Sequence, residues 1–267
     1  MKCSASIVTY NNSLSEIDKL INCFLGECFL FIVDNSSENK LSTLNKYEYV
    51  QYIHNPSNPG FGKAHNIAIK KAIENGFAYH FIINPDVHFQ TDIIDKMLFY
   101  MQQNPSVGML MPQILNLDGS VQNLPKLLPS PYSVLMRKLK SPKLVYDDFI
   151  NKYELRFVNK EMIYNTPILS GCFTLLNLRA IEEVGMYDDE FFMYFEDWDL
   201  SRRMHQYYKT IYFPLVSVYH GYESGANKSP RLFKIYINSA ITYFNKWGWF
   251  FDLERKRINN EALSQFK

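Results

Sequence analysis

The stretch Phe29-Leu30-Phe31-Ile32-Val33-Asp34-Asn35-Ser36-Ser37 joins an apolar run to a polar turn. The run is nearly continuous rather than alternating, which is typical of a strand that is buried on both faces of a sheet. Asp, Asn and Ser follow at once, and their side chains favour turns because they bond to the nearby backbone. This stretch therefore predicts a buried strand that ends in polar side chains.

Short apolar runs alternate with amphipathic segments of helix length over the first 115 residues. Strands are expected at 5–9, 29–33, 49–53, 79–83 and 107–111, and helices at 13–24, 63–75 and 92–102. Asn12 or Ser13 is expected to cap the first helix, and Gly76 to end the second. This alternation predicts an α/β fold with a Rossmann-like, mostly parallel central sheet flanked by helices. Ligands bind beyond the carboxyl ends of such strands, where residues 9–12, Asp34 and Asp86 would converge.

The sequence after residue 115 is less regular. Asp118-Gly119 is a hairpin signal. The segment 124–143 holds four Pro and five Lys or Arg without an acidic residue, and it is expected to be a mobile or surface segment. Further strands are expected at 168–176 and 211–219, and further helices at 196–206 and 231–247.

Composition and charge exclude several classes of protein. Lys and Arg number 28 against 27 Asp and Glu, and this balance argues against a nucleic-acid binder with a broad basic face. The four cysteines lack a zinc-binding spacing, so free thiols in a reducing cytoplasm are expected. No apolar run approaches the roughly 18 residues that span a bilayer. Aromatic residues make up 16% of the chain, and they could pack a core or meet a sugar or a membrane.

Glu196-Asp197-Trp198-Asp199 is the densest group of acidic residues, and it follows the aromatic run 191–195. Three carboxylates at a helix start could simply interact with the helix dipole. A dry aromatic wall, however, favours a general base in a cleft. Both interpretations stay open from these residues alone.

Asn84-Pro85-Asp86 ends a strand with an amide and a carboxylate in alternate positions. These oxygens could hold a divalent cation on a diphosphate, although an isolated Asn-Pro-Asp is more often a plain turn. Together with Asp34 they predict a nucleotide crevice. The loop containing Gly60-Phe61-Gly62 opens a helix and could hold a phosphate through its backbone NH groups, but it matches neither a Walker loop nor a dinucleotide fingerprint.

Two further features allow a structural and a functional interpretation. His220 follows a strand and is either a structural histidine or a metal ligand. The last 25 residues hold Phe244, Trp247 and Trp249-Phe250-Phe251 beside Arg255-Lys256-Arg257. These rings either pack on the core or anchor the chain at a membrane interface.

The ordered set of motifs from about residue 5 to 222 resembles the inverting family 2 glycosyltransferases of GT-A fold. The segments that carry the resemblance are 7–12, 33–37, 58–66, 84–86, 169–173 and 192–200. Bacterial rhamnosyltransferases of O-antigen or other cell-surface polysaccharide synthesis are the most similar branch. Asn84 departs from the family's Asp-x-Asp motif, which lowers the expected metal affinity because an amide brings no charge.

The resemblance implies a role for each matching residue. Those implied to bind the nucleotide sugar are Thr9, Tyr10, Asn11, Asp34, Asn35, Gly60, Asn66 (in a loop near the donor), Asn84 and Asp86. Asp197 is the implied catalytic base with Glu196 beside it; Gly171, Cys172 and Trp198 are implied to bind the acceptor; Asp86 and His220 are implied to hold Mg²⁺ or Mn²⁺. The implied layout is a donor-binding half (1–115), an acceptor-binding and catalytic half (116–225) and a helical, aromatic and basic C-terminal segment (226–267).

The implied reaction moves rhamnose from dTDP-rhamnose to a lipid-linked oligosaccharide, in the cytoplasm at the inner face of the membrane. A UDP-hexose or UDP-N-acetylhexosamine donor is the first alternative, because sugar choice depends on a few pocket contacts. A non-catalytic carbohydrate- or nucleotide-binding module and an α/β nucleotidyltransferase are the others. The intact acidic residues argue against the former, and release of pyrophosphate from a triphosphate would identify the latter.

Overall fold

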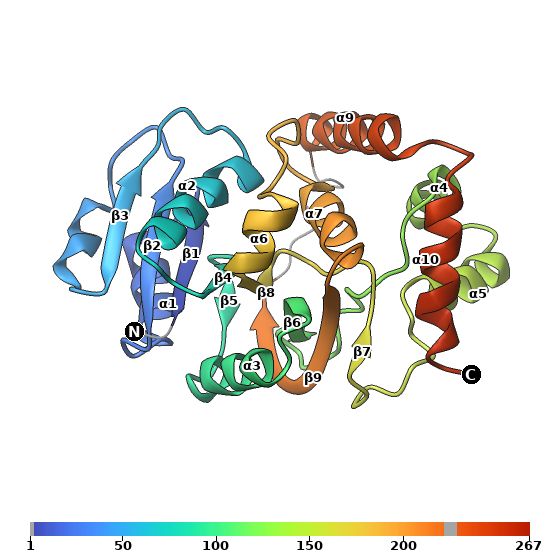
Figure 1. Cartoon of the computed structure of the whole chain (residues 1–267). Helices are drawn as coiled ribbons and strands as arrows, with labels where there is room; N and C mark the ends of the chain where they lie inside the picture. The colour runs from blue at the N-terminus through green and yellow to red at the C-terminus, as the bar shows by residue number, and fades with distance from the viewer. Residues whose placement is uncertain (1–2, 222–228) are drawn as a thin grey trace.

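The computed structural model describes residues 3–221 and 229–267, which form a mixed sheet surrounded by helices (Figure 1). The strands are β1 (Cys3–Thr9), β2 (Cys28–Asp34), β3 (Val50–His54), β4 (Tyr79–Ile83), β5 (Val87–His88), β6 (Val107–Leu115), β7 (Tyr164–Asn165), β8 (Phe173–Asn177) and β9 (Lys209–His220). The helices are α1 (Leu14–Asn22), α2 (Phe61–Glu74), α3 (Asp92–Gln103), α4 (Pro131–Leu139), α5 (Lys143–Tyr153), α6 (Leu178–Val184), α7 (Glu196–His205), α9 (Pro230–Trp247) and α10 (Leu253–Ser264), with a 3₁₀ turn η1 (Ser42–Lys46). The strand order is β3-β2-β1-β4-β8-β6-β9-β5, and β7 pairs with β9.

The first half of the sheet has the predicted parallel arrangement. Strand β1 lies between β2 and β4 and is parallel to both. Thr9 is opposite Asp34, and Ile7 is opposite Ile83. The carboxyl ends of these three strands therefore lie side by side at one edge, as the strand pattern predicts.

The first helix also begins where the sequence predicts. The Ser13 hydroxyl accepts a hydrogen bond from the Glu16 NH, and the Glu16 carboxylate accepts one from the Ser13 NH. This reciprocal pair satisfies two backbone donors that the helix cannot satisfy internally. Ser13, rather than Asn12, is therefore the cap.

The parallel pattern breaks at β8, which runs antiparallel to both β4 and β6. The strand expected at 168–176 begins only at Phe173, because the preceding residues leave the sheet as a loop. In that loop the Leu169 NH donates to the Ser201 hydroxyl and the Gly171 NH donates to the Asp197 carboxylate. The loop is thus fastened to helix α7.

Only the second part of the segment 124–143 is the surface segment that its composition suggests: residues 139–143 are exposed, whereas residues 125–129 are buried. Leu127 and Leu128 are buried, and Lys126 is only 4% exposed. The Lys126 ammonium donates to the carbonyl of Leu124 at 2.8 Å, which satisfies part of its hydrogen-bonding need inside the protein. Ser130 then caps helix α4. The Pro and Lys content did not reveal this folded segment, because its stabilising contacts are tertiary.

Cys3 and Cys28 are paired as a disulfide between the first residues of β1 and β2. The expectation of free thiols is wrong for this pair, because the parallel register brings two residues that are 25 positions apart into contact. Cys23 and Cys172 are free.

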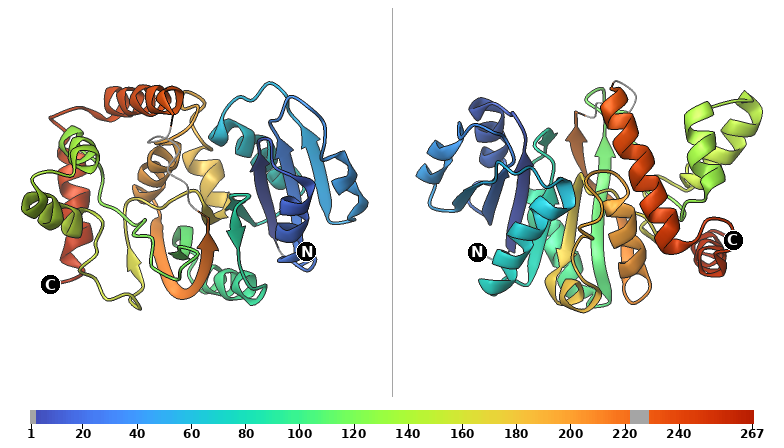
Figure 2. Two further views of the ribbon diagram at one scale, coloured as in Figure 1. Left: turned by 180° about the vertical axis from the view of Figure 1, so that it is seen from behind. Right: turned by 90° about the horizontal axis from the view of Figure 1, so that it is seen from above.

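The C-terminal segment packs on the core through part of its aromatic residues. Tyr243 and Phe244 of α9 are buried, whereas Phe250 and Phe251 are 76% and 98% exposed. Seen from above, α4 and α5 lie at the edge of the molecule, on the far side of α9 from the sheet (Figure 2, right). The packing interpretation thus holds for Tyr243 and Phe244, whereas membrane contact through Phe250 and Phe251 stays a prediction.

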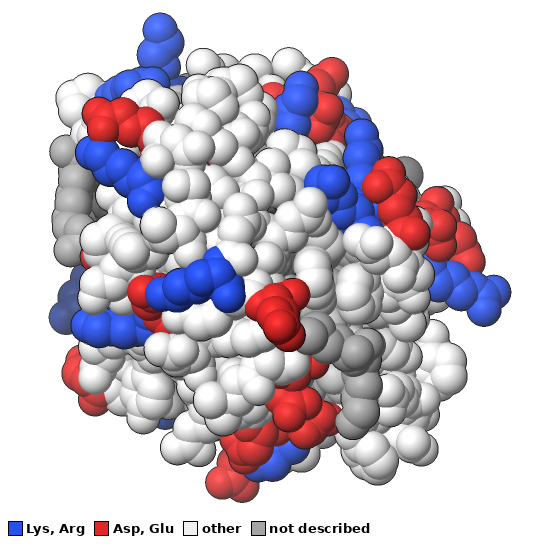
Figure 3. All heavy atoms as spheres, turned by 90° about the vertical axis from the view of Figure 1, so that its left-hand side faces the viewer, with Lys and Arg blue, Asp and Glu red and all other residues white. Residues whose placement is uncertain are grey.

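Two surface properties bear on the expected partners. None of the helices in residues 3–221 and 229–267 has the length and apolarity that crossing a bilayer demands. On the face at the β3 end of the sheet, acidic and basic side chains lie among one another (Figure 3). This mixture is in keeping with the nearly balanced charge of the sequence.

Candidate active site

Asp34 lies at the end of β2, and its carboxylate holds the polar side chains around this strand end in place. One of its carboxylate oxygens accepts from the Thr9 hydroxyl at 3.1 Å and from the Ser36 hydroxyl at 2.6 Å. The other accepts from the Tyr52 hydroxyl at 2.9 Å. Burial comes first among the causes that raise the pKa of Tyr52, and the bond to Asp34 adds to it. Tyr52 was missed by sequence reasoning, since only the β2–β3 pairing brings it to Asp34.

A small cavity of about 90 Å³ opens above this network. Its lining includes Asp34 together with Asn11, Asn12, Ser36 and Lys40. The Asn11 NH donates to the Ser36 hydroxyl, which ties the β1 loop to the β2 loop. Tyr10 beside it is exposed, and the buried Asn35 accepts from the Asn55 amide. The first two strand ends therefore form a rigid polar crevice.

Gly60 and Asn66 hold the loop before the acidic helix rather than facing this crevice. A Cβ at Gly60 would lie 2.1 Å from the Phe192 carbonyl oxygen, so only glycine permits this approach. Asn66 lies in helix α2, which corrects its expected place in a loop. Its side chain accepts from the Tyr187 NH and donates to the Tyr187 carbonyl. Both residues thus position the segment that leads to Asp197.

Asp86 and His220 meet because the short strand β5 pairs antiparallel with the end of β9. The Asp86 carboxylate lies 3.3 Å from His220 Nε2, and the Asn84 amide nitrogen is also 3.3 Å from that atom. Burial pushes the pKa of Asp86 up, but the hydrogen bond and charge of His220 outweigh it and leave the pKa below its usual value. The structure therefore brings together the three residues expected to serve a metal.

Gln122 determines which nitrogen of His220 faces Asp86. The Gln122 amide NH₂ donates to the His220 carbonyl at 2.9 Å, so the amide oxygen turns toward the ring and lies 3.2 Å from Nδ1. Because that oxygen can only accept, Nδ1 carries the proton, and Nε2 is the ring atom that faces Asn84 and Asp86 and can ligate a cation once it is deprotonated. A histidine held in this way is typical of metal sites. Gln122 was missed because it lies 98 residues from its partner.

The donor atoms of this site fit a divalent cation. The Asn84 side-chain oxygen is buried and has no hydrogen-bond partner in the structure. A flip of the amide, whose nitrogen lies toward His220, would add this oxygen to the Asp86 carboxylate and the His220 nitrogen, a mixed set that suits Mn²⁺ and, less well, Mg²⁺. Among the described residues no group of three or more His, Cys, Asp and Glu gathers, so a bound diphosphate would complete the ligands.

Asp197 begins helix α7 and is bound at both of its carboxylate oxygens. One accepts from the Gly171 NH at 3.2 Å and the other from the Trp198 NH at 2.9 Å. Burial raises the pKa of Asp197, while these NH groups and the charge of Lys126 partly oppose the rise. A raised pKa brings a carboxylate closer to the range in which a general base works best.

Glu196 beside it has a different character. Its side chain is buried and one carboxyl oxygen has no hydrogen-bond partner in the structure. Burial and then the charge of Asp197 raise its pKa well above the usual value. These causes favour Asp197 over Glu196 as the member of the pair that ionises first.

Two adjacent residues connect Asp197 to the group formed by Asn84, Asp86 and His220. Gly171 bonds to Asp197, and the carbonyl of the next residue, Cys172, accepts from the Asn84 NH at 2.8 Å. Cys172 itself is buried, and burial raises the pKa of its thiol to about 12, so it is not a nucleophile. The expected base and the expected metal ligands thus share one edge of the sheet.

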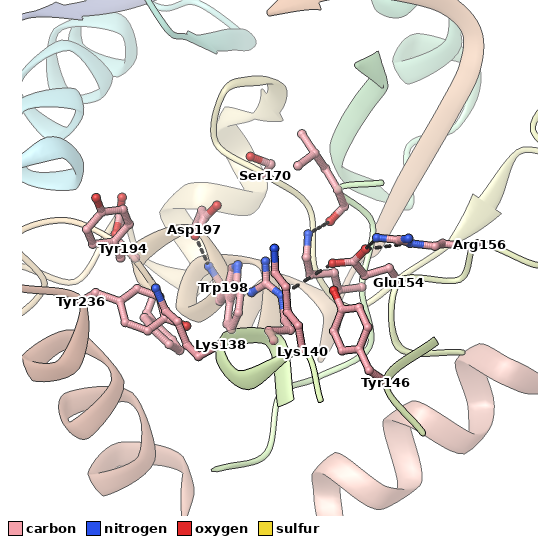
Figure 4. Close-up of a pocket in the computed structure, with 15 residues that line it drawn as sticks. Lys138, Lys140, Tyr146, Glu154, Arg156, Ser170, Tyr194, Asp197, Trp198 and Tyr236 are labelled. Carbon is pink, nitrogen blue, oxygen red and sulfur yellow. Dashed lines mark hydrogen bonds and ion pairs between the residues drawn. The ribbon is translucent and has the colours of Figure 1, made fainter. Parts of the chain in front are cut away.

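A larger cavity of about 470 Å³ opens at Asp197, and we refer to it as the basic cavity (Figure 4). Its lining is Leu124, Lys126, Arg137, Lys138, Lys140, Tyr146, Glu154, Arg156, Ser170, Tyr194, Phe195, Glu196, Asp197, Trp198 and Tyr236. Trp198 lines it as the sequence analysis expects. Gly171 and Cys172 do not line it, but they support its edge through Asp197. This volume is in the range of pockets that hold small organic ligands.

Known proteins resemble this chain in sequence and in fold. The model of the family described as glycosyl transferase family 2 matches residues 4–185. Over 214 residues the chain is 27% identical to the N-acetylglucosaminyl-diphospho-decaprenol L-rhamnosyltransferase of Mycobacterium tuberculosis. This alignment covers 75% of this chain and 69% of the relative. The chain is 26% identical over 205 residues to the dTDP-rhamnosyl transferase RfbF of Shigella flexneri, covering 76% of this chain and 63% of the relative.

Solved structures share the fold. TarS of S. aureus (residues 1–349) has a TM-score of 0.60 at 15% identity, over 98% of this chain and 71% of that chain. The mannosyltransferase PcManGT from Pyrobaculum calidifontis, solved with GDP-Man and Mn²⁺, has a TM-score of 0.58 at 14% identity, over 99% and 74%. Because the family model matches well over half of its residues, the chain belongs to glycosyl transferase family 2, and it is a glycosyltransferase of GT-A fold.

Proposed function

We propose that the protein transfers rhamnose from dTDP-rhamnose to a lipid-linked glycan, with inversion, in the synthesis of a bacterial surface polysaccharide such as O-antigen. The observation that carries the reaction is the Asp197 carboxylate, which is bound by two backbone NH groups at the mouth of the basic cavity. Support for the donor and acceptor comes from the two rhamnosyltransferase relatives.

Asp197 takes the proton of an acceptor hydroxyl while that oxygen bonds to the anomeric carbon of the donor. The bond from the anomeric carbon to the diphosphate breaks, and the nucleoside diphosphate leaves with the electron pair. The residues proposed to bind the donor lie in 1–115, the base and acceptor site in 116–225, and the C-terminal helices in 226–267.

Asp86, His220 and Asn84 are proposed to hold Mn²⁺ or Mg²⁺ against the donor diphosphate. When bound there, the cation supplies positive charge to a departing phosphate group. Thr9, Asp34 and Asn35 are proposed to bind the nucleoside through the crevice that they line or brace.

The donor assignment is tested by incubating the protein and an acceptor with a panel of nucleotide sugars. Transfer from dTDP-rhamnose with release of dTDP and inverted configuration in the product, read by NMR, supports the proposal. Turnover with only a UDP-hexose or UDP-N-acetylhexosamine would overturn the donor and leave the family unchanged.

Gln122→Leu is expected to weaken Mn²⁺ binding by about 10- to 100-fold, because His220 loses the partner that holds its Nε2 toward Asp86. Titration of Mn²⁺ followed by EPR, with a nucleoside diphosphate present, measures the affinity. Gln113→Leu is the matched control, since it removes a similar bond from β6 to Ser217 on β9. Equal Mn²⁺ affinity in the two variants would contradict this role.

Membrane contact at the inner face of the cytoplasmic membrane is proposed through exposed apolar side chains. Helix α9 exposes Phe233, Ile237 and Ile241 at four-residue intervals, and Phe250 and Phe251 follow it. Truncation before this segment would remove buried core residues, so point changes are the better test. Flotation with anionic vesicles is expected to fall at least about tenfold for the Phe250→Ser, Phe251→Ser variant and to stay unchanged for Phe99→Ser, an exposed ring on α3. Equal flotation of both variants would show that Phe250 and Phe251 do not contribute to membrane binding.

A further inference from the structure

The basic cavity holds more positive charge than the proposed chemistry at Asp197 uses. Five of its lining side chains are cationic, namely Lys126, Arg137, Lys138, Lys140 and Arg156. They come from three places along the chain: the segment before α4, helix α4 with its C-terminal cap, and the turn after α5. In Figure 4, Lys138 and Lys140 lie below Asp197, and Arg156 lies on the opposite side of the cavity from Asp197.

Acidic side chains neutralise only part of this charge. Glu154 is nearly buried and is shared by Arg156 at 2.9 Å and Arg137 at 3.6 Å. Glu196 and Asp197 are the other two acidic residues of the lining. Among the described residues no carboxylate lies within ion-pair distance of Lys140. Even with all three carboxylates ionised, the five cations outnumber the anions in the lining by two.

One of these positive charges, that of Lys126, is buried, which makes the excess of positive charge energetically more unfavourable. Its ammonium group donates to the backbone carbonyls of Leu124 and Asn123, which supply no charge. Burial is the main cause that lowers the pKa of Lys126 to about 8, and the charges of Glu154 and Asp197 partly oppose this shift. A buried ammonium that donates only to backbone carbonyls indicates that an anion can complete the site.

That anion is not the donor diphosphate. Neither Asp34 nor the trio Asn84, Asp86 and His220 lines the basic cavity, and the donor diphosphate is proposed to lie against those residues. Asp197 stands between the two regions, through Gly171 on one side and the cavity on the other. The anion in the basic cavity therefore belongs to the molecule that reacts from the acceptor side.

The chemistry of the lining favours a phosphate ester over a carboxylate. A phosphate offers several strong acceptor oxygens that can meet an Arg fork and the point charges of Lys at once. Trp198 and Tyr236 add aromatic surface to the same lining, and Arg137 and Lys138 lie over their rings at 5.6 and 4.4 Å, respectively. A sugar ring against the aromatic residues would place its hydroxyl at Asp197 and its phosphate among the cations.

We propose that the side of the basic cavity lined by Lys126, Lys138, Lys140 and Arg156 binds a phosphate or diphosphate ester carried by the acceptor. The inference rests on the proposed function, because it assigns this cavity to the acceptor of the same reaction. It makes the phosphate a determinant of specificity: a sugar lacking it is a poor acceptor even when its hydroxyl can reach Asp197.

The test compares two acceptors with the same N-acetylglucosamine and the same short alkyl chain, one joined by a diphosphate and one by a neutral glycosidic bond. Calorimetry is expected to show at least about tenfold tighter binding of the diphosphate by the unmodified protein. Lys140→Gln and Arg156→Gln should each lose about tenfold of that affinity and leave the neutral glycoside and the nucleoside diphosphate unaffected. Lys143→Gln is the matched control, because Lys143 lies at the start of α5 outside the cavity lining.

Each result separates the two proposals. Equal affinity for both acceptors, or equal loss in Lys140→Gln and Lys143→Gln, overturns the phosphate site, even if transfer from dTDP-rhamnose occurs. A tighter diphosphate complex in a protein that turns over no donor supports the phosphate site and overturns the proposed function. If Lys140→Gln weakens binding to anionic vesicles but not to the soluble diphosphate, the cations serve lipid headgroups and the acceptor site is overturned.

Discussion

Asp197→Asn is expected to lower kcat by about 10²- to 10⁴-fold, the usual contribution of a general base. The Asn oxygen can still accept from the Gly171 NH or the Trp198 NH, so the loop and the helix start should keep their positions. The amide cannot take a proton from the acceptor hydroxyl. Initial rates with saturating donor and acceptor measure the loss, and the affinity for the nucleoside diphosphate should stay within about twofold of the parent.

Glu196→Gln is the matched control for this variant. Because burial and the charge of Asp197 raise the pKa of Glu196 and so favour its neutral form, the amide replaces a group of nearly the same shape, and kcat should fall by less than about tenfold. Similar losses in the two variants would show that the pair acts as a unit or that the base is misassigned. A folded Asp197→Asn protein with near-normal turnover would contradict the assignment outright.

The pH dependence of kcat/KM provides a second readout of the same base. Asp197 works only when ionised, and burial raises its pKa above the ordinary aspartate value. The rate should therefore fall as the pH drops through this raised pKa, at a higher pH than an exposed aspartate would give. The residual activity of Asp197→Asn should lack this acidic limb.

Arg202→Met is expected to reduce the free energy of unfolding by about 3–5 kcal/mol, as breaking a buried ion pair does. The Arg202 guanidinium is only 1% exposed and bonds both oxygens of Asp252, at 2.8 and 2.9 Å. It also lies 4.2 Å from the centre of the Trp247 ring. The substitution leaves buried Asp252 with only the longer ion pair to Arg255, at 3.7 Å, and loosens the C-terminal segment from helix α7. Urea unfolding followed by circular dichroism measures the change.

Arg257→Met is the control, because Arg257 pairs with Glu261 on the exposed face of α10. Exposed pairs of this kind contribute about 0.3–0.5 kcal/mol. Adding Asp252→Leu to Arg202→Met should recover part of the lost stability, because the most buried carboxylate is then gone, although Glu254 and Arg255 each lose a partner and α10 loses its cap. A loss below about 1 kcal/mol for Arg202→Met would show that the pair does not fasten α10 to α7.

Acid should weaken this pair. Burial alone would raise the pKa of Asp252, but the hydrogen bond and charge of Arg202 lower it in the folded protein. Stabilisation from Asp252 is therefore present above the unfolded pKa and is lost as the pH falls through the folded one. The difference between the parent and Arg202→Met should shrink over that acidic range.

The sequence by itself determined the parts of this protein that depend on local pattern. The apolar run before Asp34 is continuous because β2 is buried on both faces, and Ser13 with Glu16 caps α1 through atoms only three residues apart. Parallel neighbours then had to bring Thr9 and Asp34 together at one edge. The ordered motifs sufficed to recognise the family.

Only the tertiary structure decided the contacts that depend on distant registers and on burial. The pairing of β5 with β9 brings Asp86 to His220, and the Gln122 amide then orients that histidine. Lys126 belongs to a Pro-rich segment that predicts an exposed charge, but the fold buries it. Strand β8 runs antiparallel to β4 in a sheet that the sequence predicts to be mostly parallel. Charge, exposure and partner choice at such positions are set by residues tens of positions away, so no local pattern could show them.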